Sequence, residues 1–176
     1  MTRYHPALVA LHWVLAILIL LALFGGTFIL DAMPNDHPNK IEGLQGHMIV
    51  GITILMLMVV RLIVRLRTAH PPEADIGNSS LNTLSRWAHW AFYLLIFGML
   101  ASGIGMSVLA GLPPIVFGGS GDPLPMTFDD LPPRIAHGIF AIALMLLIAG
   151  HIAAALYHQF VRKDGLLRRM WFGKRT

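Results

Sequence analysis

Residues 135–161 read IAHGIFAIALMLLIAGHIAAALYHQFV, and this stretch decides the fold. It contains no Asp, Glu, Lys or Arg, and it exceeds the roughly 18 apolar-dominated residues that a helix needs to cross a hydrocarbon core of about 30 Å. It also carries three histidines: His137 and His151, which are costly inside a bilayer, and His158 near its end. The stretch therefore predicts a membrane-spanning helix whose polar side chains need an explanation.

Three further charge-free stretches repeat this pattern along the chain. Apolar residues make up 56% of the sequence and charged residues 12%, against about 25% charged in a typical soluble domain. So few charges cannot cover a water-facing surface, and the apolar excess must face lipid. We predict an all-α fold, an up-and-down transmembrane four-helix bundle that forms one membrane domain over residues 1–176. The predicted helices cover residues 8–30, 44–66, 85–109 and 135–160.

The basic residues fall very unevenly across the connections. Eleven of the 13 Lys and Arg lie in the N-terminal tail, around the connection between the second and third helices, or in the C-terminal tail. The other two connections carry only Lys40 and Arg134, together with six of the nine acidic residues. By the positive-inside rule both termini are cytoplasmic and these two connections face outward.

Two segments outside the helices have distinctive compositions. The outer loop, residues 110–134, is rich in Pro and Gly and long for a simple connection, so it forms either a lid or a flexible loop. The C-terminal tail, residues 162–176, mixes basic with large apolar residues and predicts an interfacial anchor. The first helix is too long for a signal-peptide core, so we expect it to be retained.

The histidines are the candidate metal ligands. The chain has no cysteine, which excludes thiolate zinc sites, iron–sulfur clusters and covalently attached haem. Methionine is a weaker alternative, because Met in a bundle core is usually filler. Five of the nine histidines lie well inside predicted helices, and His158 lies at the inner end of the fourth. The five are His12, His47, His89, His137 and His151.

Position along the alternating helices places these histidines at two depths. His12 and His89 lie early in helices that start inside, and His47 and His137 lie early in helices that start outside. His151 follows His137 by 14 residues, about 21 Å along the axis and within about 40° of the same face. Two levels of facing histidines predict two stacked b-type haems. The spacing leaves open whether His12 or His89 is the partner of His151.

Simpler explanations compete with this prediction. One intramembrane histidine is equally well explained by a hydrogen bond to a neighbouring helix, but four at two matched depths favour haem. A zinc ion needs ligands that converge on one point, which a separation of about 21 Å forbids. Small residues beside the histidines fit a flat macrocycle, although they also permit ordinary helix packing: Gly46, Gly51, Gly138 and Gly150.

Several motifs carry a resemblance to a known family. The first helix has LHW at 11–13, the second GHMIVG at 46–51 and LMVVRL at 57–62, and the third AHW at 88–90; the fourth has IAH at 135–137 and HIAAAL at 151–156, followed by KDG at 163–165. Over nearly its whole length the chain resembles the bacterial cytochrome b561 family of four-helix di-haem cytochromes.

The resemblance implies a ligand set and a function. It implies that His12 and His151 bind the inner haem and that His47 and His137 bind the outer haem. It also implies one-electron transfer across the bacterial inner membrane with quinone as a partner. In one branch of the family superoxide is the electron donor. The acidic outer side of this chain disfavours an anionic substrate, although Lys40 and Arg134 could form a local positive site. The alternative is another periplasmic electron donor.

Further residues have candidate roles beside the haems. We expect Arg134 and Lys40 near outer haem propionates and Arg61 or Arg65 near inner ones; the alternative for all four is anchoring to lipid headgroups. His89 and His158 are candidate contacts for quinone or proton transfer. For these two a structural role is the more common explanation.

Two rival functions remain. The chain could be the membrane cytochrome b subunit of a larger dehydrogenase or hydrogenase complex, although its short tails and small loops offer little docking surface. It could instead be a haem-free transporter or assembly protein, which predicts no visible absorption. The loops contain no Gly-rich phosphate-binding motif, and we expect no nucleic-acid partner.

Overall fold

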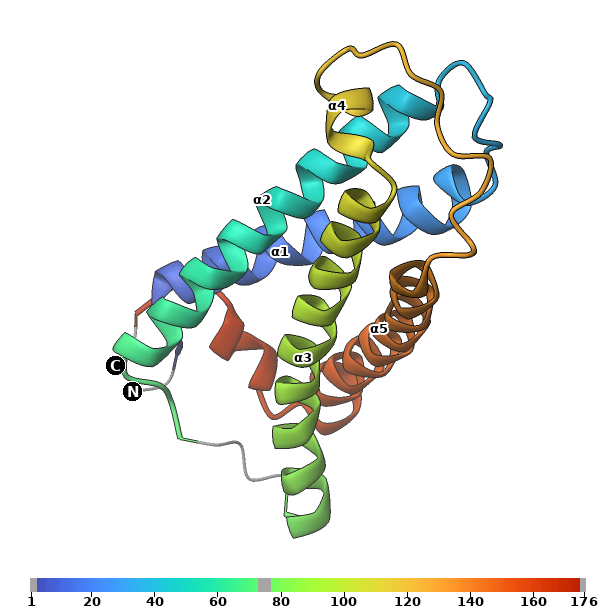
Figure 1. The fold of residues 1–176 in the computed structure, drawn as a ribbon. Coiled ribbons are helices and arrows are strands. Elements are labelled where there is room, and N and C mark those ends of the chain that lie inside the picture. Colours follow the sequence, from blue (N-terminus) through green and yellow to red (C-terminus); the bar gives the residue numbers. More distant parts are fainter. Residues whose placement is uncertain (1–2, 73–76, 175–176) are drawn as a thin grey trace.

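The computed structural model describes residues 3–72 and 77–174, and over these residues it consists of helices and connections without strands (Figure 1). The four long helices are α1 (Pro6–Phe24), α2 (Lys40–Arg67), α3 (Ser79–Leu109) and α5 (Pro132–Leu156). Helix α1 continues as the π-helix η1 (Gly25–Leu30), and α5 continues as the π-helix η2 (Tyr157–Arg162). All four are long and apolar enough to cross a membrane, which confirms the predicted all-α transmembrane bundle.

The long helices begin earlier than the predicted bounds of 8, 44, 85 and 135, and local features explain the starts of α3 and α5. Helix α3 begins at Ser79 because the Asn78 side chain accepts hydrogen bonds from the backbone N–H groups of Ser80 and Leu81, at 3.0 and 3.2 Å. Helix α5 begins at Pro132, whose missing N–H costs nothing in the first turn of a helix. These added turns are more polar than the membrane-spanning parts.

The bundle has two ends, a terminal end and an α4 end (Figure 1). The terminal end carries both chain termini and the connection from α2 to α3. The α4 end carries the connection from α1 to α2 and the one from α3 to α5. Helix α1 packs mainly against α2, and α3 mainly against α5.

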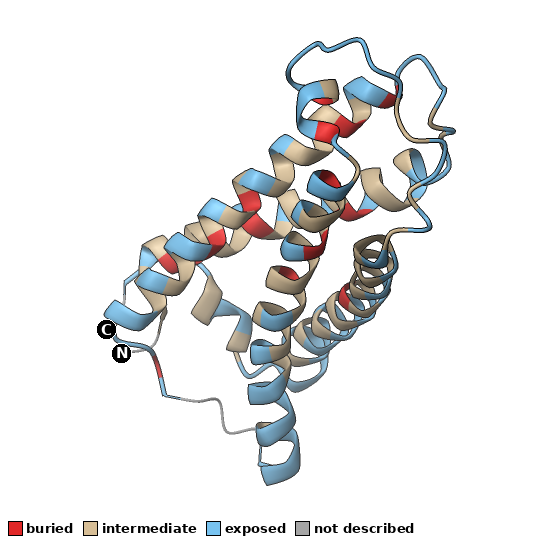
Figure 2. Cartoon of the chain, viewed as in Figure 1, coloured by how far each residue is buried: buried red, intermediate tan, exposed pale blue. Residues whose placement is uncertain are grey.

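The core lies midway along the bundle and draws on all four long helices. Its buried side chains are Leu15, Leu23, Ile54, Met58, Ile96 and Leu144. The outward faces of the helices are largely exposed (Figure 2), and they carry large apolar side chains such as Leu94 and Leu146, which are 73% and 70% exposed. An apolar surface this extensive requires lipid around it.

The connection between α3 and α5 contains the short helix α4 (Leu112–Val116). Gly111 adopts a left-handed conformation, with φ of 62°, and lets the chain reverse between α3 and α4. Leu112 and Val116 are buried against Leu44 of α2, and the Gln45 side chain donates a hydrogen bond of 3.1 Å to the Val116 carbonyl. This packing holds the α4 part of the loop against α2, whereas residues 117–123 are exposed; that the loop acts as a lid stays a prediction.

The C-terminal tail folds back onto the terminal end through the 3-10 helix η3 (Leu166–Met170). The Trp13 indole N–H donates a hydrogen bond of 2.9 Å to the Met170 carbonyl, and its ring lies 5.8 Å from that of Trp171. Arg3 donates a hydrogen bond of 2.5 Å to the Phe172 carbonyl. The tail therefore packs against the start of α1; that it also anchors at the membrane interface stays a prediction.

Candidate functional site

Four histidines from three helices form two facing pairs inside the bundle. At the α4 end, the ring centroids of His47 on α2 and His137 on α5 lie 6.3 Å apart. At the terminal end, those of His12 on α1 and His151 on α5 also lie 6.3 Å apart. Helix α5 thus contributes one histidine to each pair.

The separation within each pair matches that of two imidazoles that share one metal ion. A metal–imidazole bond is about 2.0–2.1 Å long and a ring nitrogen lies about 1.1 Å from its ring centre, so two rings on opposite sides of a metal have centroids about 6.3 Å apart. Ring nitrogens in direct contact with one another would bring the centroids closer. The two pairs therefore have the spacing of axial ligands at two separate centres.

Hydrogen bonds orient the His137 ring. Its Nδ1 lies 3.1 Å from the Met99 carbonyl oxygen and 3.1 Å from the Ser102 hydroxyl, and that hydroxyl donates to the same carbonyl at 2.8 Å. An Nδ1–H group that donates to the carbonyl leaves Nε2 unprotonated and free to bind a metal. Such outer partners commonly fix the orientation of metal-binding histidines.

Replacement of Ser102 with alanine is expected to weaken cofactor binding at the α4-end pair by about tenfold, because ligands that lose such partners lose 10- to 100-fold in affinity. The measurement is the rate of cofactor loss to an excess of a high-affinity acceptor protein. Ser107→Ala is the matched control, since both serines lie on α3 and both are 8% exposed. Equal rates for the two variants would exclude the role assigned to Ser102.

Two glycines provide the space in which the α4-end rings lie. A Cβ atom on Gly26 would lie 3.0 Å from Cε1 of His47, and one on Gly103 would lie 3.2 Å from Cε1 of His137. Both distances are shorter than normal carbon contacts, so a side chain at either position displaces a ring. The glycines singled out from the sequence do not touch these rings: Gly46, Gly51, Gly138 and Gly150.

A third histidine lies at the terminal end. The His89 ring is 5.9 Å from that of His151 and perpendicular to it, so His89 stays close enough to compete with His12. Its Nδ1 lies 2.6 Å from the Ser85 carbonyl oxygen. Unlike His12, His89 is exposed, so it is the less sheltered of the two neighbours of His151.

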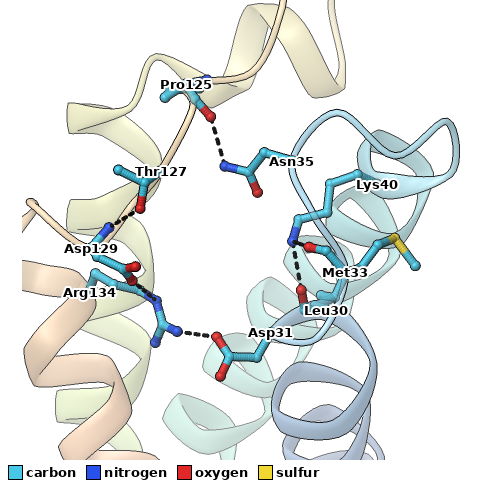
Figure 3. Close-up of polar contacts among 9 residues, drawn as sticks. All are labelled: Leu30, Asp31, Met33, Asn35, Lys40, Pro125, Thr127, Asp129 and Arg134. Carbon is cyan, nitrogen blue, oxygen red and sulfur yellow. Dashed lines mark hydrogen bonds and ion pairs between the residues drawn. The ribbon is translucent and has the colours of Figure 1, made fainter.

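Acidic residues engage Arg134 at the α4 end (Figure 3). Arg134, at the start of α5, forms an ion pair and hydrogen bond with Asp31, and its Nε lies 3.7 Å from Asp129. Asp31 follows η1, whereas Asp129 belongs to the loop before α5. The guanidinium therefore joins two connections, and Arg134 itself lies about one helical turn before His137 on α5.

The other cation of this end, Lys40, is also engaged (Figure 3). Only 5% of the residue is exposed, and its Nζ donates hydrogen bonds to the carbonyl oxygens of Leu30 and Met33 at 2.6 and 2.5 Å. Beside it, the Asn35 side chain donates a hydrogen bond of 2.7 Å to the Pro125 carbonyl. Lys40 and Arg134 thus close the α4 end and do not form an open positive surface.

His158 lies at the end of η2 and pairs with Asp164. Its Nδ1 is 2.6 Å from the Asp164 carboxylate, whose other oxygen accepts a hydrogen bond from the Leu166 N–H at 3.1 Å. The hydrogen bond with His158 is the main cause that lowers the pKa of Asp164 below its ordinary value of 3.8. The pair joins η2 to the docked tail, which is a structural role.

The effect of this pair on stability should depend on pH. A carboxyl group whose pKa is lowered by folding stabilises the protein above its ordinary pKa, and the stabilisation disappears as the pH falls through the lowered value. We expect Asp164→Asn to lower the unfolding temperature in detergent by about 2 °C at neutral pH, because the pair is partly exposed. The difference from wild type should shrink below pH 3.8. Asp130→Asn, at an exposed loop position, is the control, and a pH-independent difference for Asp164→Asn would refute the assignment.

Comparison with known sequences identifies the family. The profile of the family described as prokaryotic cytochrome b561 matches residues 3–173. The chain belongs to this family. As a cytochrome b561 it is a multi-pass protein of the bacterial inner membrane that binds b-type haem and takes part in electron transfer.

Three curated relatives are similar to this cytochrome b561 along nearly their full length. The probable superoxide oxidase CybB of Yersinia pestis is 27% identical over 98% of both chains. Cytochrome b561 homolog 2 of Escherichia coli (strain K12) is 28% identical over 96% of this chain and 90% of that protein. Cytochrome b562 of Cereibacter sphaeroides is 29% identical, covering 95% of this chain and 94% of that protein.

The histidine pairs fit the cofactor of this family. Imidazole nitrogen is a common axial ligand of haem iron, and each pair has the separation that two axial imidazoles require. The contacts of His137 with Met99 and Ser102, and the glycines against the α4-end rings, were not apparent from the sequence. The Gly25-Gly26 pair inside a predicted helix was the one sequence signal that could have suggested a close approach.

Proposed function

We propose that this cytochrome b561 binds two haems and transfers single electrons across the inner membrane, to or from the quinone pool. The observation that carries the proposal is the equal separation of 6.3 Å within two histidine pairs at opposite ends of one bundle. His12 and His151 would hold one haem, and His47 and His137 the other. When bound, iron with two imidazole ligands supplies outer-sphere one-electron chemistry, since no coordination position is left for substrate.

The distribution of charge supports an orientation for this path. Eleven of the 13 Lys and Arg belong to the tails or to the region around the α2–α3 connection, and by the positive-inside rule this supports a cytoplasmic position for the terminal end. The His12–His151 pair then lies toward the cytoplasm and the His47–His137 pair toward the periplasm. Between the two pairs lies the core formed by Leu15, Ile54, Ile96 and the other buried apolar side chains, which keeps water away from the space between the centres.

The first test is a dithionite-reduced minus oxidised spectrum of the purified protein, with a pyridine haemochrome assay that counts haem per chain. The proposal predicts two b haems per chain and reduction of both by a quinol in detergent or liposomes. A single haem would refute the two-centre arrangement. No haem, despite adequate haem supply during expression, would favour a haem-free transporter or assembly protein.

Superoxide is a second candidate partner at the periplasmic side. The relative from Yersinia pestis, named a probable superoxide oxidase, supports this narrower activity. The charges of the α4 end count against it, because Arg134 is paired with Asp31 and Asp129 and Lys40 is bound to carbonyl groups. The test is quinone reduction driven by a superoxide source, with and without superoxide dismutase. A rate that dismutase does not change would point to another periplasmic donor.

The remaining alternative is a membrane subunit of a larger dehydrogenase or hydrogenase complex. It predicts that a large soluble subunit co-purifies with the chain from native membranes. Isolation of the chain without such a subunit, with its quinone reactivity intact, supports a free-standing cytochrome.

A further inference from the structure

The terminal end holds a positive charge and a buried hydroxyl group whose partners are incomplete among residues 3–72 and 77–174. Arg61 lies within the membrane span Lys40–Arg67, where an unpaired charge is costly. Tyr93 on α3 lies next to it. Neither residue has a role in the function proposed above, so both need an explanation.

The Tyr93 hydroxyl is buried and unsatisfied. Its oxygen makes no hydrogen bond to any residue that the structure describes. A buried hydroxyl without a partner loses its hydrogen bonds to water and gains nothing in return. The neighbouring Arg61 can only donate to the hydroxyl oxygen, because a guanidinium has no acceptor. The hydroxyl hydrogen of Tyr93 therefore still needs an acceptor, which none of the described residues supplies.

Arg61 lacks a counter-ion. Within residues 3–72 and 77–174 it forms no ion pair, and its Nη1 donates a hydrogen bond of 3.0 Å to the Leu8 carbonyl. Arg134 at the other end of the bundle has Asp31 and Asp129 beside it. A half-buried guanidinium without a carboxylate fits a position where a bound anion provides the negative charge.

Both residues adjoin the terminal-end histidine pair. The Leu8 carbonyl that Arg61 contacts is one helical turn before His12, and Arg61 lies close enough to influence the His12 ring. The residue before Tyr93, Phe92, places its ring 5.3 Å from that of His151. An anion between Arg61 and Tyr93 would therefore belong to a ligand held at this pair.

We propose that Arg61 and the Tyr93 hydroxyl together bind a carboxylate of the terminal-end haem, that is, a haem propionate. The guanidinium supplies the charge and the phenol supplies a directed hydrogen bond to the same group. This assignment rests on the proposed function, because it requires a haem at the His12–His151 pair. It also selects Arg61 over Arg65 among the two arginines considered for the inner side.

The experiment uses the holoprotein in a His47→Ala background, which leaves only the terminal-end haem. Resonance Raman spectra report the propionate bending band, and redox titration reports the reduction potential. Tyr93→Phe should shift the band and lower the potential, because a donor that offsets the propionate charge is lost. Arg61→Gln should lower the potential further, and both variants should lose haem about tenfold faster to an acceptor protein.

Matched controls separate this role from a general effect on packing. Tyr157→Phe changes the same group on an exposed residue of η2, and Arg65→Gln removes a charge one turn from Arg61; both should leave band and potential unchanged. An unchanged propionate band in Tyr93→Phe would overturn the assignment, because a lipid phosphate or a structural contact would then be the partner. An equal shift in the controls would overturn it as well. Absence of haem from the His47→Ala parent would instead refute the proposed function.

Discussion

Replacement of His47 with alanine is expected to leave one haem per chain, held at the terminal end by His12 and His151. The His47 and His137 rings have the separation expected of two imidazoles that bind one iron. Removal of the His47 ring leaves this pair with one ligand in place of two. The haem at the terminal end should persist, because His151 lies about 21 Å from His137 along α5 and its partner His12 belongs to the other pair. The measurement is the pyridine haemochrome count, together with one remaining step in a redox titration.

The matched variant and the control make this result specific. His12→Ala should also leave one haem, in this case the haem at the His47–His137 pair. The reduction potential of the remaining haem should therefore differ between the two variants. His37→Ala, at an exposed position in the α1–α2 connection, should keep both haems. Retention of two haems in His12→Ala would contradict the assigned ligand set, and it would identify His89, whose ring is 5.9 Å from that of His151, as the ligand in its place.

The second large effect is expected from the smallest possible substitution, Gly26→Ala. The added Cβ would lie 3.0 Å from Cε1 of His47 and would displace a ring that must stay aligned with the iron. Overpacking of a dense interior typically costs about 1–3 kcal/mol, a factor of about 10 to 100 in affinity. We expect haem affinity at the α4-end pair to fall by this factor, measured as the rate of haem loss, while the terminal-end haem is unaffected.

The neighbouring glycine provides the control. A Cβ on Gly25 would meet nothing within 4 Å, so Gly25→Ala adds the same methyl group to the same helix without a contact. Gly103→Ala should resemble Gly26→Ala, since its Cβ would lie 3.2 Å from the His137 ring. Equal haem loss in Gly25→Ala and Gly26→Ala would show that the effect comes from the helix backbone and not from the ring.

Much of the fold could be predicted because the signal for a membrane helix is local. Residues 135–161 have the length and the apolar composition to span a bilayer whatever surrounds them, and the structure places α5 and η2 there. The ends of the helices were less predictable, since a cap such as Asn78 extends α3 by turns that carry polar residues. Helix α4 was missed entirely, because five residues with two prolines give no periodic pattern.

The candidate site was also only partly predictable from the sequence. The depth of each histidine follows from its place in an alternating helix, so two levels could be predicted from position alone. Which ring faces which depends on how the helices rotate and how closely they approach, and the charge-free stretches do not encode either. The bonds of His137 to Met99 and Ser102, and the close approach of Gly26 to His47, all cross between helices for this reason.

The sequence by itself determined the membrane class, the number of spanning helices and the two depths of histidine, because these depend on hydrophobicity and on the rise of 1.5 Å per residue. Only the tertiary structure decided the pairing distances, the groups that orient the rings, and the ion pair of Arg134 with Asp31 at one end of the bundle. It also decided that Arg61, at the other end, pairs with no carboxylate of the described residues. These depend on contacts between helices far apart in the sequence, and such contacts are set by the packing of the whole bundle.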